Sequence, residues 1–460
     1  MTGKELLEHL KTDKASEIFQ KLYGPEGLES ARRRYASLIE GLLRDGPEGF
    51  PARDFPETAG NLRVFSAPGR TELGGNHTDH NQGKVLAASI QLDSVAIVAP
   101  RRDKRVLFRS AAYPDVAVDL SDLAPRQEER GTTESLVRGI AAELANRGVS
   151  VGGFTANAAS TVLPGSGLSS SAAVEVLLGR IFDSLYAGGK RSALEIAQIG
   201  QIAENDYFGK PSGLMDQAAC ASGGAVAIDF GDIEYPLVTQ VDFDLAAVGY
   251  ALCVVDTHGS HADLTPDYAA VPEEMRALAR FFGKTVLREL TVEEVLGRAA
   301  DIRKAAGDRA LLRALHFFRE NERVDAMLAA LEKVNAGQGK EINLWAFFNY
   351  LDQVNQSGDS SWELLQNIYS PKNPAEQGIA LALALTREFF DTAVTGVYGT
   401  PGESIMGACR VHGGGFAGTI QAYIPLDCVD GYREKMEALF GAGAVRVLRI
   451  RPVGAVELKL

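Results

Sequence analysis

Cysteine is scarce in this sequence of 460 residues, which contains four cysteines at widely separated positions and no CxxC pair. Small disulfide-rich domains and zinc ribbons both need closely spaced cysteines, so the sequence encodes neither of them. This cysteine usage predicts a reducing compartment, and we expect the protein to be cytoplasmic.

A long apolar run and an excess of basic residues are also missing. The longest uninterrupted apolar stretch, Leu245 to Val255, is well short of the ~20 residues that a membrane-spanning helix needs. Residues 1–17 are charged throughout and lack the apolar core of a signal peptide. Lysine and arginine number 47 against 60 aspartates and glutamates, which gives a formal net charge of -13. We therefore expect neither a membrane nor a nucleic acid as a partner.

Apolar residues make up 45% of the chain and charged residues 23%, which is the composition of a globular protein long enough for two or three domains. Helical periodicity predicts a helical N-terminal extension over residues 1–60. From residue 62 onward, β-branched and aromatic runs predict strands that alternate irregularly with helices, so the expected fold class is α+β. Residues 272–334 are helical and charged, and predict a solvated helical layer.

A glycine- and serine-rich turn between a predicted strand and a predicted helix is the most informative segment. It reads LPGSGLSSSAA from Leu163 to Ala173. Its glycines permit a tight turn close to a ligand, the free N–H groups of a helix start favour an anion, and serine hydroxyls can bind that anion or a hard cation. For an isolated copy of this pattern, an ordinary helix N-cap is the better explanation. The residues that would form a phosphate site are Gly165, Ser166, Gly167, Leu168, Ser169, Ser170 and Ser171.

Other phosphate and hydrolase motifs are not satisfied. The GKT triplet at residues 283–285 lacks the preceding glycine of a P-loop and follows a helical pattern rather than a strand. No serine lies in a GxSxG pentapeptide. These two observations exclude a P-loop NTPase and give no support to a serine hydrolase.

Two further segments concentrate ionisable residues. Residues 67–84, APGRTELGGNHTDHNQGK, follow a strand and are too polar and too rich in glycine for a packing role, so we expect a ligand-binding loop. Residues 204–217, ENDYFGKPSGLMDQ, place Glu204 at the end of a helix and Asp216 in a glycine loop. One carboxylate could hold Mg²⁺ while the other accepts a proton, as phosphoryl transfer commonly requires. The alternative for both segments is a solvated surface loop.

Together these segments resemble the GHMP family of small-molecule kinases, and galactokinases in particular. Residues 67–84 are similar to the galactokinase signature, 163–173 to the ATP-binding motif, and 407–419 to the C-terminal glycine motif. Residues 204–217 resemble the stretch that carries the metal-ligand glutamate and the catalytic aspartate. Four motifs in the family's order are far more specific than any one of them. The resemblance implies a two-lobed fold with the active site in the cleft between the lobes.

The resemblance and the composition also divide the chain and assign roles. They place an ATP- and sugar-binding domain at residues 61–240 and a C-terminal domain at 241–460. Asp216 is expected to accept the proton of the sugar's anomeric hydroxyl, and Arg70 to lower the pKa of Asp216 and stabilise the moving phosphoryl group. Mg²⁺ is expected on Ser171 and Glu204, and the ATP phosphates on residues 165–171. Sugar contacts are expected from Asn76, His77, Thr78, Asp79, Asp216 and Tyr268.

The expected reaction is therefore the Mg²⁺- and ATP-dependent phosphorylation of a sugar at C1. Three positions depart from the galactokinase pattern, because Glu72, Asn76 and His80 stand where the family has Asn, an acid and Tyr. The family acid replaced by Asn76 faces the sugar's C6 hydroxyl, and an amide tolerates a C6 carboxylate that an acid would repel. Galactose, galacturonate, arabinose and N-acetylgalactosamine are thus all candidate substrates.

A non-catalytic sensor of sugar and ATP is the second class of function that the resemblance allows. The serine motif is intact, and the expected base, its arginine and the metal-ligand glutamate are all present, which favours an enzyme. A monomer would suffice for either function, and the sequence leaves the oligomeric state open.

Overall fold

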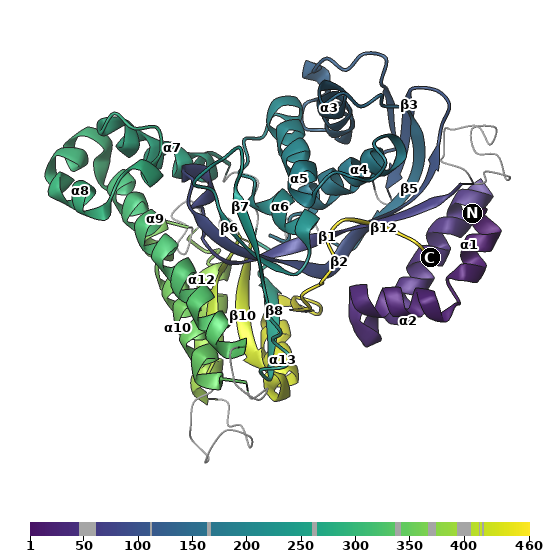
Figure 1. Cartoon of the computed structure of the whole chain (residues 1–460). Coiled ribbons are helices and arrows are strands. Elements are labelled where there is room, and N and C mark those ends of the chain that lie inside the picture. Colours follow the sequence, from purple (N-terminus) through teal and green to yellow (C-terminus); the bar gives the residue numbers. More distant parts are fainter. Residues whose placement is uncertain are drawn as a thin grey trace.

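The computed structural model describes residues 1–45, 61–110, 113–162, 167–259, 265–335, 342–366, 374–392, 406–413, 415 and 418–460. These residues form two lobes, each built on its own β-sheet with helices packed against it (Figure 1). The predicted α+β class and two-lobed architecture are confirmed. No helix in these ranges combines the length and the apolar character needed to cross a bilayer.

The first sheet contains eight of the described strands. Its main path runs β12-β1-β2-β5-β3-β4, while β6 pairs with the first half of β2 and β7 pairs with β6. Among the described pairs, only β3 and β5 run parallel. The strands are β1 (Arg63–Gly74), β2 (Lys84–Pro100), β3 (Arg105–Ser110), β4 (Val116–Asp119), β5 (Phe154–Ser160), β6 (Ala225–Asp229), β7 (Leu237–Val241) and β12 (Val456–Leu458).

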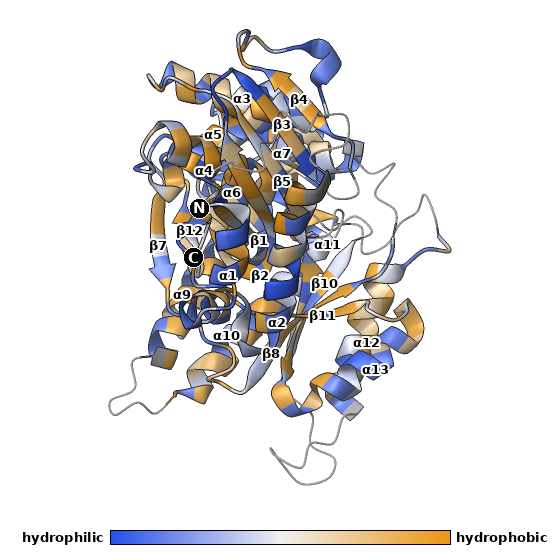
Figure 2. Cartoon of the chain, turned by 90° about the vertical axis from the view of Figure 1, so that its right-hand side faces the viewer, coloured by the Kyte–Doolittle hydropathy of each residue, from blue (hydrophilic) through white to orange (hydrophobic). Residues whose placement is uncertain are grey.

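Four helices cover one face of this sheet and enclose its largest core. They are α3 (Thr133–Asn146), α4 (Ser170–Tyr186), α5 (Ala193–Ile202) and α6 (Met215–Ser222). Their apolar faces meet the alternate side chains of β1, β2 and β5, and Phe154 packs edge-on to Phe182 with ring centroids 5.1 Å apart. These strands are mainly hydrophobic in Figure 2, as expected for a sheet covered on both faces.

The N-terminal helices cover part of the opposite face. Helices α1 (Gly3–His9) and α2 (Asp13–Asp45) pack on Val64, Val95, Ile97 and Leu458 of the sheet. The predicted helical extension is thus observed over residues 3–45, and residues 46–60 lie outside the described residues. This extension completes the core of the first lobe.

The second sheet has four described strands in the antiparallel order β11-β8-β10-β9. Two helices pack on one face, α12 and α13, while α9 and α10 fill the space between its other face and the first sheet. The elements are β8 (Tyr250–Asp256), α7 (Thr265–Phe281), α8 (Val292–Gly297), α9 (Ala299–Asn335), α10 (Leu344–Asp359), α11 (Ser361–Leu364), α12 (Gly378–Thr392), β9 (Ala408–His412), β10 (Thr419–Pro425), α13 (Val429–Phe440) and β11 (Val445–Leu448).

The chain crosses between the lobes more than once. The predicted boundary near residue 240 falls where β7 ends and the chain turns toward β8, and its exact place stays a prediction. Strand β12 returns to the first sheet and pairs with β1, with Val64 opposite Leu458. Because β1 carries Arg70, both ends of the sequence brace the strand that leads into the site.

Candidate active site

Arg70 and Asp216 meet where β1 and α6 come together. The Arg70 guanidinium donates to Asp216 Oδ1 from both Nε and Nη2, each at 2.7 Å, and its Nη1 donates to the Gly167 carbonyl. The Asp216 side chain is 32% exposed, whereas the Arg70 side chain is 7% exposed. Asp216 lies in the first turn of α6 and not in the glycine loop expected from the sequence. The arginine therefore fixes a carboxylate that stays accessible to a ligand.

The surroundings of Asp216 keep it ionised. Burial raises its pKa, but the neighbouring Arg70 guanidinium and the Ser169 hydroxyl, which donates to Oδ2 at 2.5 Å, together hold the pKa below its usual range. Positive charge at the helix start acts in the same direction. The group is an anion at neutral pH and can accept a proton or a hydrogen bond from a bound hydroxyl.

The serine-rich turn contributes two hydroxyls with different partners. Ser169 has the left-handed backbone values φ 58 and ψ 60 and points its hydroxyl at Asp216, while α4 starts at Ser170. Ser171 Oγ lies 3.4 Å from Glu204 Oε1. Gly165 and Ser166 lie outside the described residues. One helix start thus joins the candidate base to the candidate metal ligand.

The end of the same turn is held between the two lobes. The Arg70 N–H donates to the Leu168 carbonyl at 3.1 Å, and the Leu168 side chain is buried in the core, so Leu168 serves the turn through its backbone. Gly167 has φ +71, and a Cβ there would lie 3.0 Å from Nδ1 of His412, which belongs to the C-terminal glycine motif. Any residue other than glycine would strain this contact.

Glu204 lies in a π-helix, Ala203–Phe208, that continues α5. Such helices are rare and gather at functional sites. Its carboxylate is 3% exposed, accepts a hydrogen bond from Gln217 Nε2 at 2.9 Å, and pairs with the Lys210 ammonium at 2.8 Å. A carboxylate and a hydroxyl are hard oxygen ligands, and this carboxylate already holds a cationic group. Ser171 and Glu204 therefore fit a site for Mg²⁺.

The loop after β1 brings the candidate sugar residues to the same place. A Cβ added to Gly213 would lie 1.8 Å from Asp79 Oδ2, so this loop touches the segment that leads into Asp216. The His77 ring, at a residue with φ 58, lies edge-on to the Tyr268 ring with centroids 5.1 Å apart. Thr78 is fully buried and its hydroxyl contacts the Gly75 and Lys84 carbonyls, so it shapes the loop from within.

Asn76 is held by residues that the sequence did not indicate. Its amide faces the Gln366 amide, with N–O distances of 3.0 and 2.9 Å. Glu320 Oε1 accepts the Gly75 and Asn76 N–H groups at 3.0 and 3.4 Å, and His316 Nε2 lies 2.8 Å from the Asn76 carbonyl. The two α9 residues are fully buried, so this part of the predicted solvated layer is wrong.

Glu72 also has a structural explanation. It replaces the family asparagine and forms a buried ion pair with Arg410 of β9. Burial raises its pKa to about 7, against the lowering effect of Arg410 and Arg70. The ion pair connects β1 to the strand within the C-terminal glycine motif.

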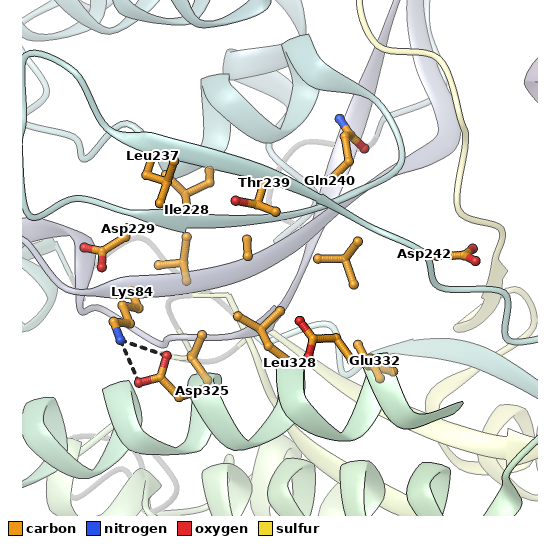
Figure 3. Close-up of a pocket in the computed structure, with 15 residues that line it drawn as sticks. Lys84, Ile228, Asp229, Leu237, Thr239, Gln240, Asp242, Asp325, Leu328 and Glu332 are labelled. Carbon is orange, nitrogen blue, oxygen red and sulfur yellow. Dashed lines mark hydrogen bonds and ion pairs between the residues drawn. The ribbon is translucent and has the colours of Figure 1, made fainter. Parts of the chain in front are cut away.

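A separate cavity of about 600 Å³ lies between α9 and the β6–β7 hairpin (Figure 3). Ile228, Leu237 and Leu328 give it an apolar lining, and the Lys84–Asp325 ion pair lies at one side. None of the candidate catalytic or metal-binding residues lines it. The cavity is therefore not part of the site described above.

Comparisons with known proteins agree with this geometry. Residues 135–224 match the model of the GHMP kinases N terminal domain, and residues 53–100 match the galactokinase galactose-binding signature. A galactokinase of Streptomyces coelicolor is 32% identical over 395 residues, which cover 84% of this chain and 91% of that protein.

Solved structures show the same fold. Lactococcus lactis galactokinase complexed with galactose superposes with a TM-score of 0.72 at 23% identity, covering 92% of this chain and all of that one. Methanococcus jannaschii mevalonate kinase gives a TM-score of 0.56 at 13% identity, covering 85% of this chain and 99% of that one. From the sequence similarity over most of its length, the chain belongs to the galactokinase family of GHMP kinases.

Proposed function

We propose that the protein transfers the terminal phosphoryl group of ATP to the C1 hydroxyl of galactose, with Mg²⁺, in the cytoplasm. The observation that carries the proposal is the Asp216 carboxylate, held by Arg70 and Ser169 at the start of the serine-rich helix. The relatives named galactokinase, and the galactose complex of one of them, support galactose as the substrate.

Each residue has a part in this reaction. Asp216 accepts the proton of the C1 hydroxyl while the oxygen of that hydroxyl attacks the terminal phosphorus of ATP. Arg70 stabilises the negative charge that develops on the transferred phosphoryl group. The N–H groups and hydroxyls at the start of α4 bind the phosphates. Ser171 and Glu204 would hold Mg²⁺, which neutralises phosphate charge when it is bound. His77, Asp79 and Tyr268 orient the sugar.

A coupled assay of ADP release over a panel of sugars tests the proposal. We expect kcat/KM to be highest for galactose, above galacturonate, arabinose and N-acetylgalactosamine. Clear preference for galacturonate or arabinose would overturn galactose as the substrate and indicate that Asn76 changes the C6 specificity. Tight galactose binding with no sugar-dependent ADP release would indicate a sensor in place of a kinase.

Replacing Glu320 with alanine is expected to raise KM for galactose about tenfold. The change leaves the buried Gly75 and Asn76 N–H groups without their acceptor, and such a loss costs about 1–3 kcal/mol. KM for ATP should change far less, because the ATP phosphates bind at the other side of the site.

Glu322→Ala provides the matched control, since Glu322 is exposed on the same helix. Initial rates at varied galactose and varied ATP give both KM values. Equal increases in the two values, or no difference from the control, would contradict a role for Glu320 in the sugar loop.

A further inference from the structure

Lys210 places its ammonium group at the candidate metal site. Its Nζ lies 2.8 Å from Glu204 Oε1, the same oxygen that faces the Ser171 hydroxyl at 3.4 Å. The Lys210 and Gly209 N–H groups both donate to the Glu204 carbonyl, at 3.1 and 2.9 Å. The backbone that ends the π-helix therefore aims this lysine at this glutamate, and the contact is more than a chance surface pair.

The side chains of Glu204 and Lys210 differ in how freely they can move. The Glu204 side chain is 3% exposed and is also held by Gln217, whereas the Lys210 side chain is 52% exposed. A lysine ammonium on a flexible stem can leave its partner and find another at small cost. The carboxylate stays in place when the ammonium moves.

Two cations compete for one oxygen at this point. The oxygen that pairs with Lys210 is the one that, with Ser171, would hold Mg²⁺. A divalent cation there would repel the ammonium at such short range. The ammonium must move away when the metal enters.

The natural next partner of Lys210 is the nucleotide. Arg70 is already bound to Asp216 and to the Gly167 carbonyl. Lys210, in contrast, loses its ion pair with Glu204 when a metal binds that carboxylate. Lys210 lies beside the start of α4, where phosphates are expected, because its Nζ and the Ser171 hydroxyl face the same Glu204 oxygen. Lysine binds phosphate well as a point charge.

We propose that Lys210 is an additional phosphate-binding residue of this site, which neutralises Glu204 in the free protein and moves to the nucleotide phosphates when a divalent metal takes Glu204. This proposal rests on the proposed function. In the metal-free protein the Lys210 ammonium occupies the position on Glu204 that the metal later takes.

Lys210→Met tests the proposal through two binding constants measured without turnover. Mn²⁺ binding to the nucleotide-free protein, followed by the electron paramagnetic resonance signal of free Mn²⁺, should become about tenfold tighter because the competing ammonium is gone. ADP binding in saturating Mg²⁺, followed by calorimetry, should become about tenfold weaker because a phosphate contact is lost. Lys210→Arg should restore ADP binding, and Lys190→Met, at an exposed lysine, should leave both constants unchanged.

Opposite shifts of the two constants support the proposal, since a merely structural defect would weaken both. Shifts in one direction, a shift in only one constant, or no shift would overturn it. The wild-type protein separates this failure from failure of the proposed function. If the wild type phosphorylates galactose and the variant keeps both binding constants, only the role of Lys210 is rejected. If the wild type shows no sugar-dependent turnover, the kinase function itself is rejected.

Discussion

Replacing Asp216 with asparagine is expected to lower kcat for galactose phosphorylation by about 10²–10⁴-fold, the range that positioned proton transfer contributes. The amide keeps the size of the side chain and one oxygen toward Arg70, but it cannot accept the proton of the C1 hydroxyl. Galactose binding should be preserved within a few-fold, because the amide oxygen can still accept a hydrogen bond from the C1 hydroxyl. Steady-state rates and galactose titration by calorimetry measure the two effects separately.

The control for this variant is Asp206→Asn. Asp206 lies two residues after Glu204 in the π-helix, and its side chain is exposed. Its loss should leave kcat within about twofold of the wild type, because surface substitutions have small effects. A kcat for Asp216→Asn close to that of the control would show that Asp216 is not the base and would require another proton acceptor.

The parts of the site that were predictable are those that short motifs encode. Arg70, Ser171, Glu204 and Asp216 each lie in a segment whose composition already indicates ligand chemistry, and the fold brings them together as the resemblance implied. Local sequence also predicts the helices of residues 272–334, which the structure has as α7, α8 and α9. It could not give the π-helix, because one extra residue per turn leaves no clear signal in a single sequence.

The parts that could not be predicted depend on contacts between distant residues. Glu320 reaches Gly75 across 245 positions of the sequence, and its charged helix resembles any solvated helix until the loop is packed against it. Gln366 likewise meets Asn76 only in the folded chain. The N-terminal helices were visible from their periodicity, but the face of the sheet that they cover was not. Such pairings are specified by the whole core rather than by any window of sequence.

Asp93 is the position where such a distant pairing should matter most for stability, and Asp93→Asn is expected to lower the free energy of unfolding by about 3–5 kcal/mol. The carboxylate is fully buried and accepts hydrogen bonds from Arg34 at 2.5 Å, Arg451 at 2.9 Å, Ser66 at 2.5 Å and Tyr23 at 2.6 Å. An amide leaves two arginines without their counter-charge and turns its own N–H groups toward donors. Urea unfolding at pH 7, followed by circular dichroism, measures the loss.

The surroundings of Asp93 also predict how its contribution to stability depends on pH. Burial raises the pKa of Asp93, but Arg34 and Arg451, with the hydroxyls of Ser66 and Tyr23, lower it further, so the net shift is downward. A carboxyl whose pKa is lower in the folded state stabilises fully above its unfolded pKa of ~3.9 and loses that contribution as the pH falls toward the folded value. The destabilisation by Asp93→Asn should therefore be largest at neutral pH and shrink below about pH 4.

Two further variants keep this prediction open to refutation. Asp103→Asn removes an exposed carboxylate that pairs with Arg101, and it should cost no more than about 1 kcal/mol. If Asp93→Asn fails to fold, Arg34→Ala removes one of the two arginine partners and should give a measurable intermediate loss, with KM for galactose unchanged. A loss for Asp93→Asn no larger than that for Asp103→Asn would mean that the N-terminal helices are held by their apolar contacts alone. A large loss would mean that the buried contacts of Asp93, with Arg34 of α2 as one of its two ion-pair partners, stabilise the folded chain. The loss for Arg34→Ala then gives the share by which this ion pair fixes α2 to β2.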